Sequence, residues 1–298
     1  MDSGRKRTIQ ELLQKYKRYS SLCDIYVEGE KDRKLLQLFF DNIGVHPIIY
    51  TINTVEIPQS IVNDLGIELR VINNNKNKNI ALAKYINSNL TPENTNQIRC
   101  IVDRDFDFFL DLHVVFTCPL LLYTDYNCIE MYAFNEKCLR KFLELTLPSF
   151  PEPANKVLPK LEQILQNIFL IRLCNETLGI QPSWANFIDH CDCTHHEISF
   201  NRDLFLDKFF QLNRLPKEIQ QNFHSILQQL EEKRDRDPRH QIYKDDCRRL
   251  FIKYLRKCGN ISDFNKNSEL FPLMGCIELE DLKQEGLFIN LTNWIKSM

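Results

Sequence analysis

The first half of the chain alternates between short apolar runs and amphipathic segments. Four runs have the length and the β-branched content of buried strands: residues 25–27, 47–52, 68–72 and 98–102. Two segments between them carry apolar side chains at helical spacing: residues 32–42 and 80–89. A further strand, interrupted near Pro119, is expected over 114–123. Strands that alternate with helices in this way indicate a mostly parallel, Rossmann-like sheet flanked by helices, and thus an α/β fold.

The second half has a different pattern, in which helical spacing predominates. Five helices are expected there: residues 135–145, 156–178, 202–210, 216–232 and 244–257. The proline-rich segment 148–153 has the composition of a linker. The sequence therefore predicts two domains, an α/β domain over 1–150 and a mainly α-helical C-terminal region over 151–298. The second domain could serve in dimerisation, in docking a partner or in lining a substrate channel.

Composition narrows the class of protein. The 298 residues are 43% hydrophobic and 26% charged, which is typical of a packed globular protein. No apolar run reaches the roughly 20 residues of a membrane-spanning helix, and the first 18 residues lack the apolar stretch of a secretory signal. The eleven cysteines are odd in number and irregularly spaced, so reduced thiols in a cytoplasmic protein are expected.

The net charge of −2 shows that the chain as a whole is not a polycation. Nucleases that hold metal ions nevertheless carry acidic clusters, and the metal restores positive charge where phosphate binds. Local basic stretches occur at 5–7, 15–18, 248–249 and 253–257. Taken one at a time, each is interpreted as a solvated helix face rather than a binding patch.

Acidic residues follow two of the predicted strands. Glu28 comes directly after the first, and Asp103 and Asp105 come after the strand at 98–102. Ligands of parallel sheets bind beyond the carboxyl ends of the strands, so these side chains are expected to share one rim. In extended backbone, the spacing of Asp103 and Asp105 would place both on one side. Oxygen ligands of this kind suit Mg²⁺ or Mn²⁺. Each motif alone could equally be a polar strand end or a loop.

These motifs resemble a known family. Residues 27–32, Val-Glu-Gly-Glu-Lys-Asp, followed by 102–105, Val-Asp-Arg-Asp, are similar to the signature of Toprim domains. Asp32 matches a second acidic position of the OLD-like Toprim nucleases. Residues 103–107 and 126–130 further resemble the small Toprim effector nucleases of PARIS-type phage-defence systems, which work beside ABC-type ATPases. Cys128 departs from the pattern, since OLD-type sites tend to have a small hydroxyl residue there.

The resemblance implies an activity and a set of partners. It implies metal-assisted hydrolysis of phosphodiester bonds, with one or two Mg²⁺ ions held by Glu28, Asp32, Asp103, Asp105 and Glu130. Lys244 falls where such proteins often keep a late lysine that could contact phosphate. The resemblance favours transfer RNA as substrate, with DNA left open, and an ABC-type ATPase as the controlling partner of a toxic anti-phage effector. A homodimer is also expected.

Several alternatives remain from the sequence. A Toprim domain could instead be a non-catalytic interaction module that regulates an ATPase complex. Primase or topoisomerase chemistry would need a zinc module or a tyrosine nucleophile on a larger scaffold. The Cys-Asp-Cys-Thr-His-His motif at 191–196 lacks the usual zinc spacing and is interpreted as a polar turn between helices. The Asn/Lys-rich segment 73–79 is interpreted as an exposed loop beside the site, and Asp107 as a cap of the following turn.

Overall fold

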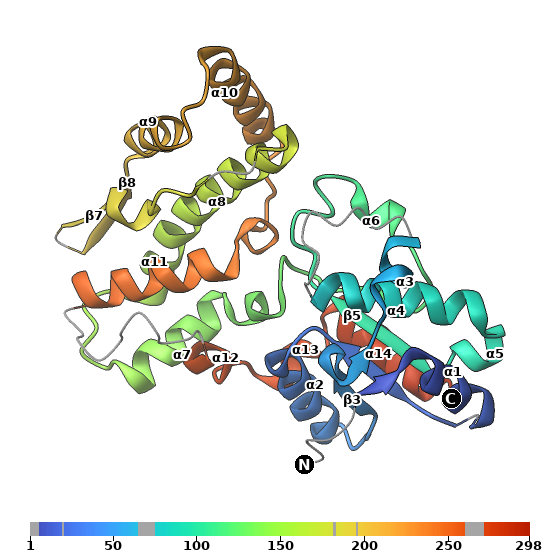
Figure 1. Cartoon of the computed structure of the whole chain (residues 1–298). Helices are drawn as coiled ribbons and strands as arrows, with labels where there is room; N and C mark the ends of the chain where they lie inside the picture. Colours follow the sequence, from blue (N-terminus) through green and yellow to red (C-terminus); the bar gives the residue numbers. More distant parts are fainter. Residues whose placement is uncertain (1–5, 20, 65–74, 181–182, 195, 260–270) are drawn as a thin grey trace. The chain divides into compact units, whose positions relative to one another are not determined.

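The computed structural model describes residues 6–19, 21–64, 75–180, 183–194, 196–259 and 271–298. The chain forms two compact units (Figure 1). The first combines 1–129 with 278–298, and the second comprises 130–277. The boundary expected near residue 150 lies at residue 129 in this division, and residues 278–298 return to the first unit. In the described residues, no helix is both long and apolar enough to cross a membrane.

The first unit is built on a four-stranded parallel sheet of order β3-β2-β5-β6. Its strands are β2 (Asp24–Val27), β3 (Ile48–Thr51), β5 (Ile98–Val102) and β6 (Leu121–Tyr123). Two further short strands pair in parallel beside it: β1 (Arg7–Thr8) and β4 (Val55–Glu56). The predicted α/β class, a parallel sheet flanked by helices and followed by a helical region, is confirmed.

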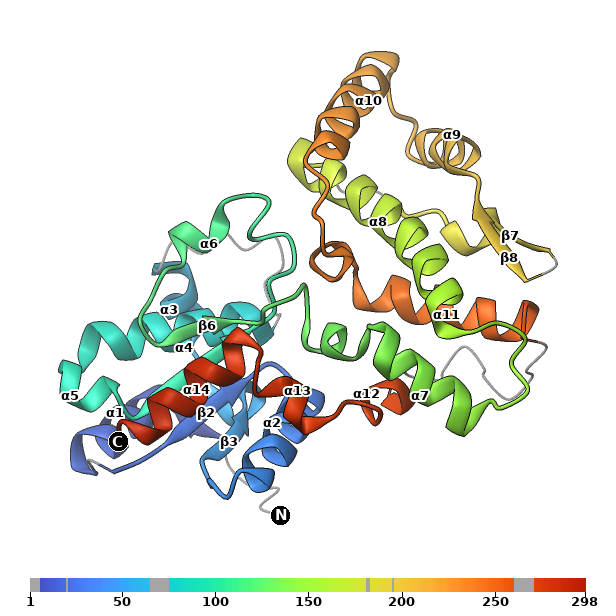
Figure 2. The ribbon, with the colours of Figure 1, turned by 180° about the vertical axis from the view of Figure 1, so that it is seen from behind.

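Helices cover both faces of this sheet. The first unit contains α1 (Ile9–Arg18), α2 (Glu30–Asn42), α3 (Gln59–Asp64), α4 (Asn75–Asn89), α5 (Pro92–Thr95), α6 (Leu112–Val115), α13 (Leu279–Leu282) and α14 (Gly286–Lys296). Alternate strand residues such as Ile98 and Cys100 pack with α1 and α4 in one apolar core. Figure 2 shows α14 on the opposite face. There the ring of Phe288 lies 4.7 Å from that of Phe39 on α2.

The return of α14 is fixed by polar contacts as well as by packing. The indole Nε1 of Trp294 donates a hydrogen bond of 2.6 Å to the carbonyl of Asn96. The guanidinium of Arg99, on β5, lies 4.7 Å from the centre of the same indole. The helix is therefore part of the α/β unit, although the sequence places it at the end of the helical half.

The second unit is mainly helical. It contains α7 (Glu136–Thr146), α8 (Ala154–Leu178), α9 (Arg202–Leu212), α10 (Lys217–Glu232), α11 (Lys244–Lys257) and α12 (Phe271–Met274). The long α8 is buried along much of its length, and α7, α10 and α11 pack against it. A two-stranded antiparallel hairpin, β7 (Cys191–Thr194) and β8 (Glu197–Phe200), completes the unit.

Most predicted elements have close counterparts, and a few predictions are wrong. The strand expected over 114–123 is reduced to β6, preceded by the short α6. The helix expected from residue 80 begins five residues earlier, at Asn75. Residues 191–194 of the cysteine and histidine motif form strand β7 of a hairpin rather than a turn between helices. The strand expected at 68–72 lies outside the described residues.

Candidate active site

The carboxyl ends of β2 and β5 bring two predicted site residues together. The two strands are hydrogen-bonded neighbours in the sheet. Just beyond them, Oε1 of Glu28 accepts a hydrogen bond of 2.9 Å from the backbone N–H of Asp103. The backbone carbonyl of Glu28 accepts a second bond, of 2.7 Å, from the side-chain amide of Asn75 at the start of α4. Glu28 is thus held at the end of β2 by a contact to its side chain from the end of β5 and by a contact to its backbone from the start of α4.

Asp103 is buried and is itself engaged with the backbone. Its Oδ1 accepts a hydrogen bond of 3.1 Å from the N–H of Ile129. This contact joins the end of β5 to the segment that follows β6. Only 6% of Asp103 is exposed. Its buried carboxylate therefore has a structural role next to Glu28, in addition to any role as an oxygen ligand.

Asp105 does not follow the extended geometry expected from its spacing to Asp103. The strand ends at Val102, and Asp105 has a φ of 46°, in the left-handed region. Aspartate tolerates this region better than most residues do. The N–H of Asp105 donates a 3.0 Å hydrogen bond to the carbonyl of Asn127. Asp105 therefore reaches the rim through a turn, and the period-two argument for it is wrong.

A buried lysine lies among the carboxylates. The Nζ of Lys76 is 3.1 Å from Asp105 Oδ2 and 3.0 Å from Asp107 Oδ2, and it donates to the carbonyl of Arg104 at 3.2 Å. Lys76 is only 6% exposed. Burial by itself lowers the pKa of this ammonium, but the neighbouring carboxylates outweigh burial and raise it above the ordinary value. Lys76 is therefore charged at neutral pH.

The sequence did not reveal this lysine. The exposed loop expected over 73–79 is wrong for residues 75–79, which are helical and bury Lys76 and Asn79. Their burial depends on polar partners, such as the 3.2 Å bond from Asn79 Nδ2 to the carbonyl of Ile101. A run of Asn and Lys has no apolar period to mark such a helix. The remaining signal was the acidic cluster itself, which needs a compensating cation.

The electrostatics of the cluster centre on Glu28. Burial and the nearby Asp105 carboxylate raise the pKa of Glu28 from 4.5 to about 7, although the bond from the Asp103 amide opposes the shift. Asp32 raises it further. Burial also raises the pKa of Asp107, with Lys76 acting against it. Negative charge is thus crowded at this rim, and Lys76 offsets only part of it.

The remaining predicted residues have other surroundings. Asp32 accepts a 2.8 Å hydrogen bond from the N–H of Gly29 and so helps to begin α2. Asp107 pairs with Lys76 through its carboxylate, which was not foreseen for a turn cap. Glu130 and Lys244 belong to the second unit. There Glu130 is buried and its charge helps to raise the pKa of the Cys247 thiol, while Lys244 is the first residue of α11.

The carboxylates suit a hard cation in chemistry and in charge. Among the described residues, no three His, Cys, Asp or Glu side chains are arranged to hold a metal as they stand. Mg²⁺, however, is usually bound through one or two carboxylates, with water and phosphate as the other ligands. Oε2 of Glu28 and Oδ1 of Asp105 have no hydrogen-bond donor in the described part of the chain. These two groups repel each other, and a divalent cation between them would relieve that repulsion.

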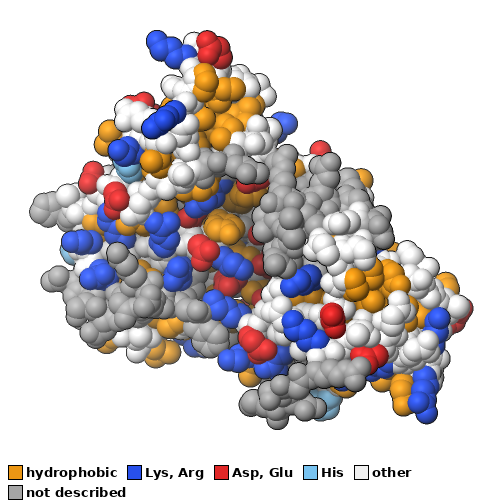
Figure 3. Space-filling model, in the orientation of Figure 1, with side chains coloured by type: hydrophobic (Ala, Val, Ile, Leu, Met, Phe, Trp, Pro, Cys, Tyr) orange, Lys and Arg blue, Asp and Glu red, His pale blue; other side chains and the backbone are white. Residues whose placement is uncertain are grey.

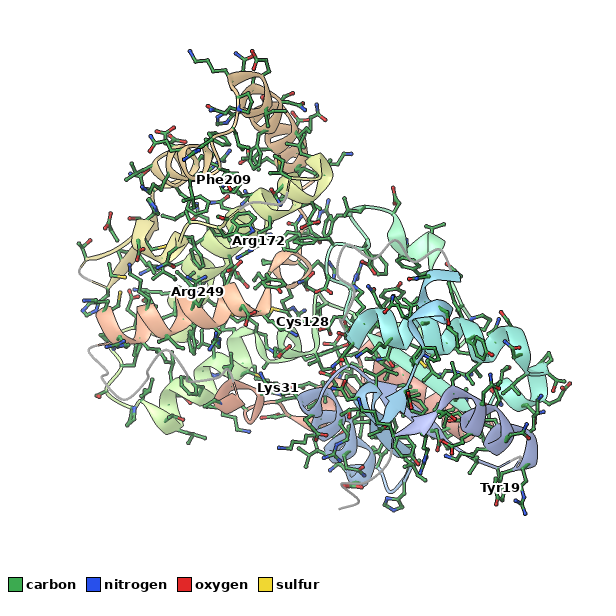
Figure 4. The ribbon with its side chains drawn as sticks, viewed as in Figure 1. Tyr19, Lys31, Cys128, Arg172, Phe209 and Arg249 are labelled. Carbon is green, nitrogen blue, oxygen red and sulfur yellow. The ribbon has the colours of Figure 1, made fainter. Side chains whose placement is uncertain are left out.

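In the described part of the cysteine and histidine motif at 191–196, no three side chains are arranged to hold a metal. The Sγ of Cys191 is buried and donates to the carbonyl of Phe187 at 3.4 Å. Burial raises the pKa of this thiol to about 12. Nδ1 of His196 lies 2.9 Å from the carbonyl of Cys258. These groups stabilise the hairpin, and Cys128 of the first unit is likewise a buried thiol (Figure 4).

The comparisons with known proteins identify no family. A scan of the sequence against protein-family models finds no match, and a search of curated proteins finds none.

Proposed function

We propose that this protein is a Mg²⁺-dependent endonuclease of the Toprim, OLD-like kind, which hydrolyses phosphodiester bonds in nucleic acid. The observation that carries the proposal is that the carboxylates of Glu28 and Asp105 interact electrostatically beyond the carboxyl ends of two neighbouring parallel strands. Each offers an oxygen without a donor in the described residues, and burial together with their repulsion raises the pKa of Glu28. Carboxylates with perturbed pKa values at such a rim are characteristic of functional sites.

The residues of the first unit have distinct roles in this proposal. Glu28 and Asp105 would hold Mg²⁺, which when bound lowers the pKa of a water and offsets charge on the phosphate. Asp103 orients Glu28 through its backbone N–H and anchors residue 129 through its carboxylate. Lys76 fixes Asp105 and leaves one of its oxygens directed elsewhere. Asp32 adds negative charge from the first turn of α2.

The finer assignments depend on the motif resemblance. In the proposal, Glu130 adds a metal ligand and Lys244 contacts the phosphate of the substrate. The enzyme works in the cytoplasm as a homodimeric, toxic effector of phage defence that an ABC-type ATPase holds in check. Transfer RNA is the favoured substrate, and DNA is the other.

A second candidate is a non-catalytic interaction module that regulates an ATPase complex. One observation favours it, namely that Lys76 already compensates the charge of Asp105 and Asp107. A carboxylate cluster with an internal counter-ion can be stable without a metal. The two candidates differ in whether Glu28 and Asp105 are required for an activity.

The test uses Glu28→Gln and Asp105→Asn, which keep size and hydrogen bonding but remove charge. Each purified protein is incubated with total bacterial RNA and with plasmid DNA, in Mg²⁺, in Mn²⁺ or in chelator. Glu30→Gln is the matched control, because Glu30 is an exposed residue near Glu28 and forms an ion pair with Arg33 on α2. Cleavage by the wild type and the control, lost in both site variants and in chelator, is the expected result.

A silent enzyme is distinguished from a binding module by two further measurements. Titration calorimetry should show Mg²⁺ binding to the wild type and to Glu30→Gln, and not to Glu28→Gln. Coexpression with a candidate ATPase partner and a phage trigger should be toxic only when Glu28 and Asp105 are intact. Toxicity or partner binding that is equal in all variants, without Mg²⁺ binding, would establish the interaction module instead.

A further inference from the structure

Helix α11 of the second unit gathers two basic stretches of the sequence on one pocket. The pocket has a volume of about 490 Å³, and five basic side chains line it: Arg248, Arg249, Lys253, Arg256 and Lys257. In Figure 3, Lys and Arg side chains gather over the part of this unit where α11 lies. None of the lining residues, all of which are described, is acidic. The stretches at 248–249 and 253–257, each interpreted singly as a solvated helix face, thus lie on one surface of α11.

The inner part of this surface is held rigidly. Lys253 donates from Nζ to the carbonyls of Ile188, at 2.6 Å, and of Cys191. Arg249 donates to the side-chain oxygen of Asn186, and its guanidinium lies 5.3 Å from the centre of the Phe187 ring (Figure 4). These partners are neutral, so the two positive charges are placed without being neutralised.

The outer part of this surface, Arg256 and Lys257, is exposed. In the described residues, neither side chain makes an ion pair or a hydrogen bond. At 1.5 Å per residue, the basic positions from 249 to 257 extend over about 12 Å of the helix. Ile188 and Ile252 supply an apolar floor between them. The surface thus combines positive side chains that are held in place with positive side chains that are exposed. Such an arrangement suits an extended anion rather than a single small one.

We propose that this α11 surface binds the phosphate backbone of nucleic acid. The inference rests on the proposed function, since a nuclease of net charge −2 needs a local basic surface to hold its substrate. Arg and Lys side chains bind successive phosphates without reading the bases. The surface therefore supplies affinity, and the cut position is determined elsewhere.

The experiment measures binding in the absence of cleavage. Full-length Glu28→Gln protein in chelator is titrated, by fluorescence anisotropy, into labelled single-stranded RNA, transfer RNA and duplex DNA at several salt concentrations. The variant adds Arg256→Gln and Lys257→Gln to this background. The matched control adds Lys208→Gln and Lys217→Gln, two exposed lysines of the same unit on α9 and α10.

The variant should bind more weakly than the control, with a smaller dependence on salt. Each lost phosphate contact reduces the slope of log K against log[salt] by about 0.7–0.9, so a reduction of about 1.5 is expected. The RNA and DNA arms show which backbone is bound. Equal affinity and slope in variant and control would overturn the inference. If the wild type cleaves nucleic acid but the variant binds as well as the control, the nuclease proposal stands and the surface proposal fails. If the surface binds nucleic acid but the wild type does not cleave it, the surface proposal stands and the nuclease proposal fails.

Discussion

The carboxylate of Glu28 accepts a 2.9 Å hydrogen bond from the backbone N–H of Asp103, a residue 75 positions further along the chain. This bond joins the ends of two neighbouring parallel strands. It means that a carboxylate proposed as a metal ligand is also part of the framework of the sheet. Substitutions that remove the whole side chain therefore change structure and chemistry together, and Glu28→Gln is the informative variant.

Glu28 should make the stability of the metal-free protein depend on pH. Its pKa is about 7 in the folded state against an ordinary value of 4.5, because of burial and the Asp105 charge. A carboxyl group with a raised folded pKa stabilises the fold below its unfolded pKa, and that contribution is lost as the pH rises through the folded value. In chelator, the free energy of unfolding is expected to fall by on the order of 2 kcal/mol between pH 4.5 and 7.

Urea unfolding at pH 4.5, 6 and 8 measures this effect. Glu28→Gln, which cannot ionise, should remove most of the fall, whereas Glu30→Gln should not. Mg²⁺ at pH 8 should raise the stability of the wild type and leave Glu28→Gln unchanged. A fall of the same size in wild type and Glu28→Gln would assign the pH dependence to another group.

Removal of Lys76 should destabilise the first unit. Lys76→Met leaves Asp107, which is buried at a side-chain exposure of 11%, without its counter-charge. Breaking a buried ion pair by removing one partner costs about 3–5 kcal/mol. Asp107→Asn in the same chain should recover part of this loss, since the double variant no longer buries an unpaired charge at position 107. Urea denaturation of the four proteins gives the coupling energy, and strictly additive losses would contradict the pairing.

The contact of α14 with the sheet should be needed for the stability of the first unit. Trp294→Ala removes an indole that is 6% exposed, its hydrogen bond to Asn96 and its contact with Arg99. A loss of about 3–5 kcal/mol is expected. Circular dichroism during urea unfolding should show an early transition that the wild type lacks. An unchanged first transition would mean that α14 contributes little.

Lys244 provides a test of the late-lysine assignment. Lys244→Ala should lower the rate of cleavage by about a hundredfold if the ammonium offsets charge in the transition state. Its effect on the unfolding midpoint should be small, because Lys244 lies in the first turn of α11 and is only partly buried. Lys217→Ala, at the corresponding position of α10, is the control. Equal rates for the two variants would remove Lys244 from the proposed mechanism.

The fold was largely predictable where apolar side chains recur with a clear period. The strand at 98–102 and the helix at 244–257 have the bounds that the pattern predicts. α14 was not foreseen as part of the first unit. Its apolar residues indicate that the helix is buried, but they do not indicate which part of the protein it packs against. The hairpin β7–β8 was missed for a similar reason, since its strands are short and rich in polar residues.

The candidate site was predictable only in part. Strand ends were sufficient to place Glu28 beside Asp103, because parallel strands end at one rim. The conformation of Asp105 depends on a turn that the sequence does not mark. Lys76 lies far from the acidic motifs along the chain, and its burial follows from tertiary pairing that no local pattern records. The grouping of basic residues on α11 becomes evident only when the helix is seen beside Asn186 and Ile188.

The division of the first unit into two stretches of chain affects the order in which the protein can form. On the ribosome, residues 130–277 are synthesised before the segment that supplies α14. At about 5–20 residues per second, this imposes a delay on the order of ten seconds between the strands and the helix that covers them. The second unit, being uninterrupted, can fold during that interval. In a nascent chain, the sheet that carries the carboxylates would thus lack α14 on one face. The helix would pack against that face only near the end of translation.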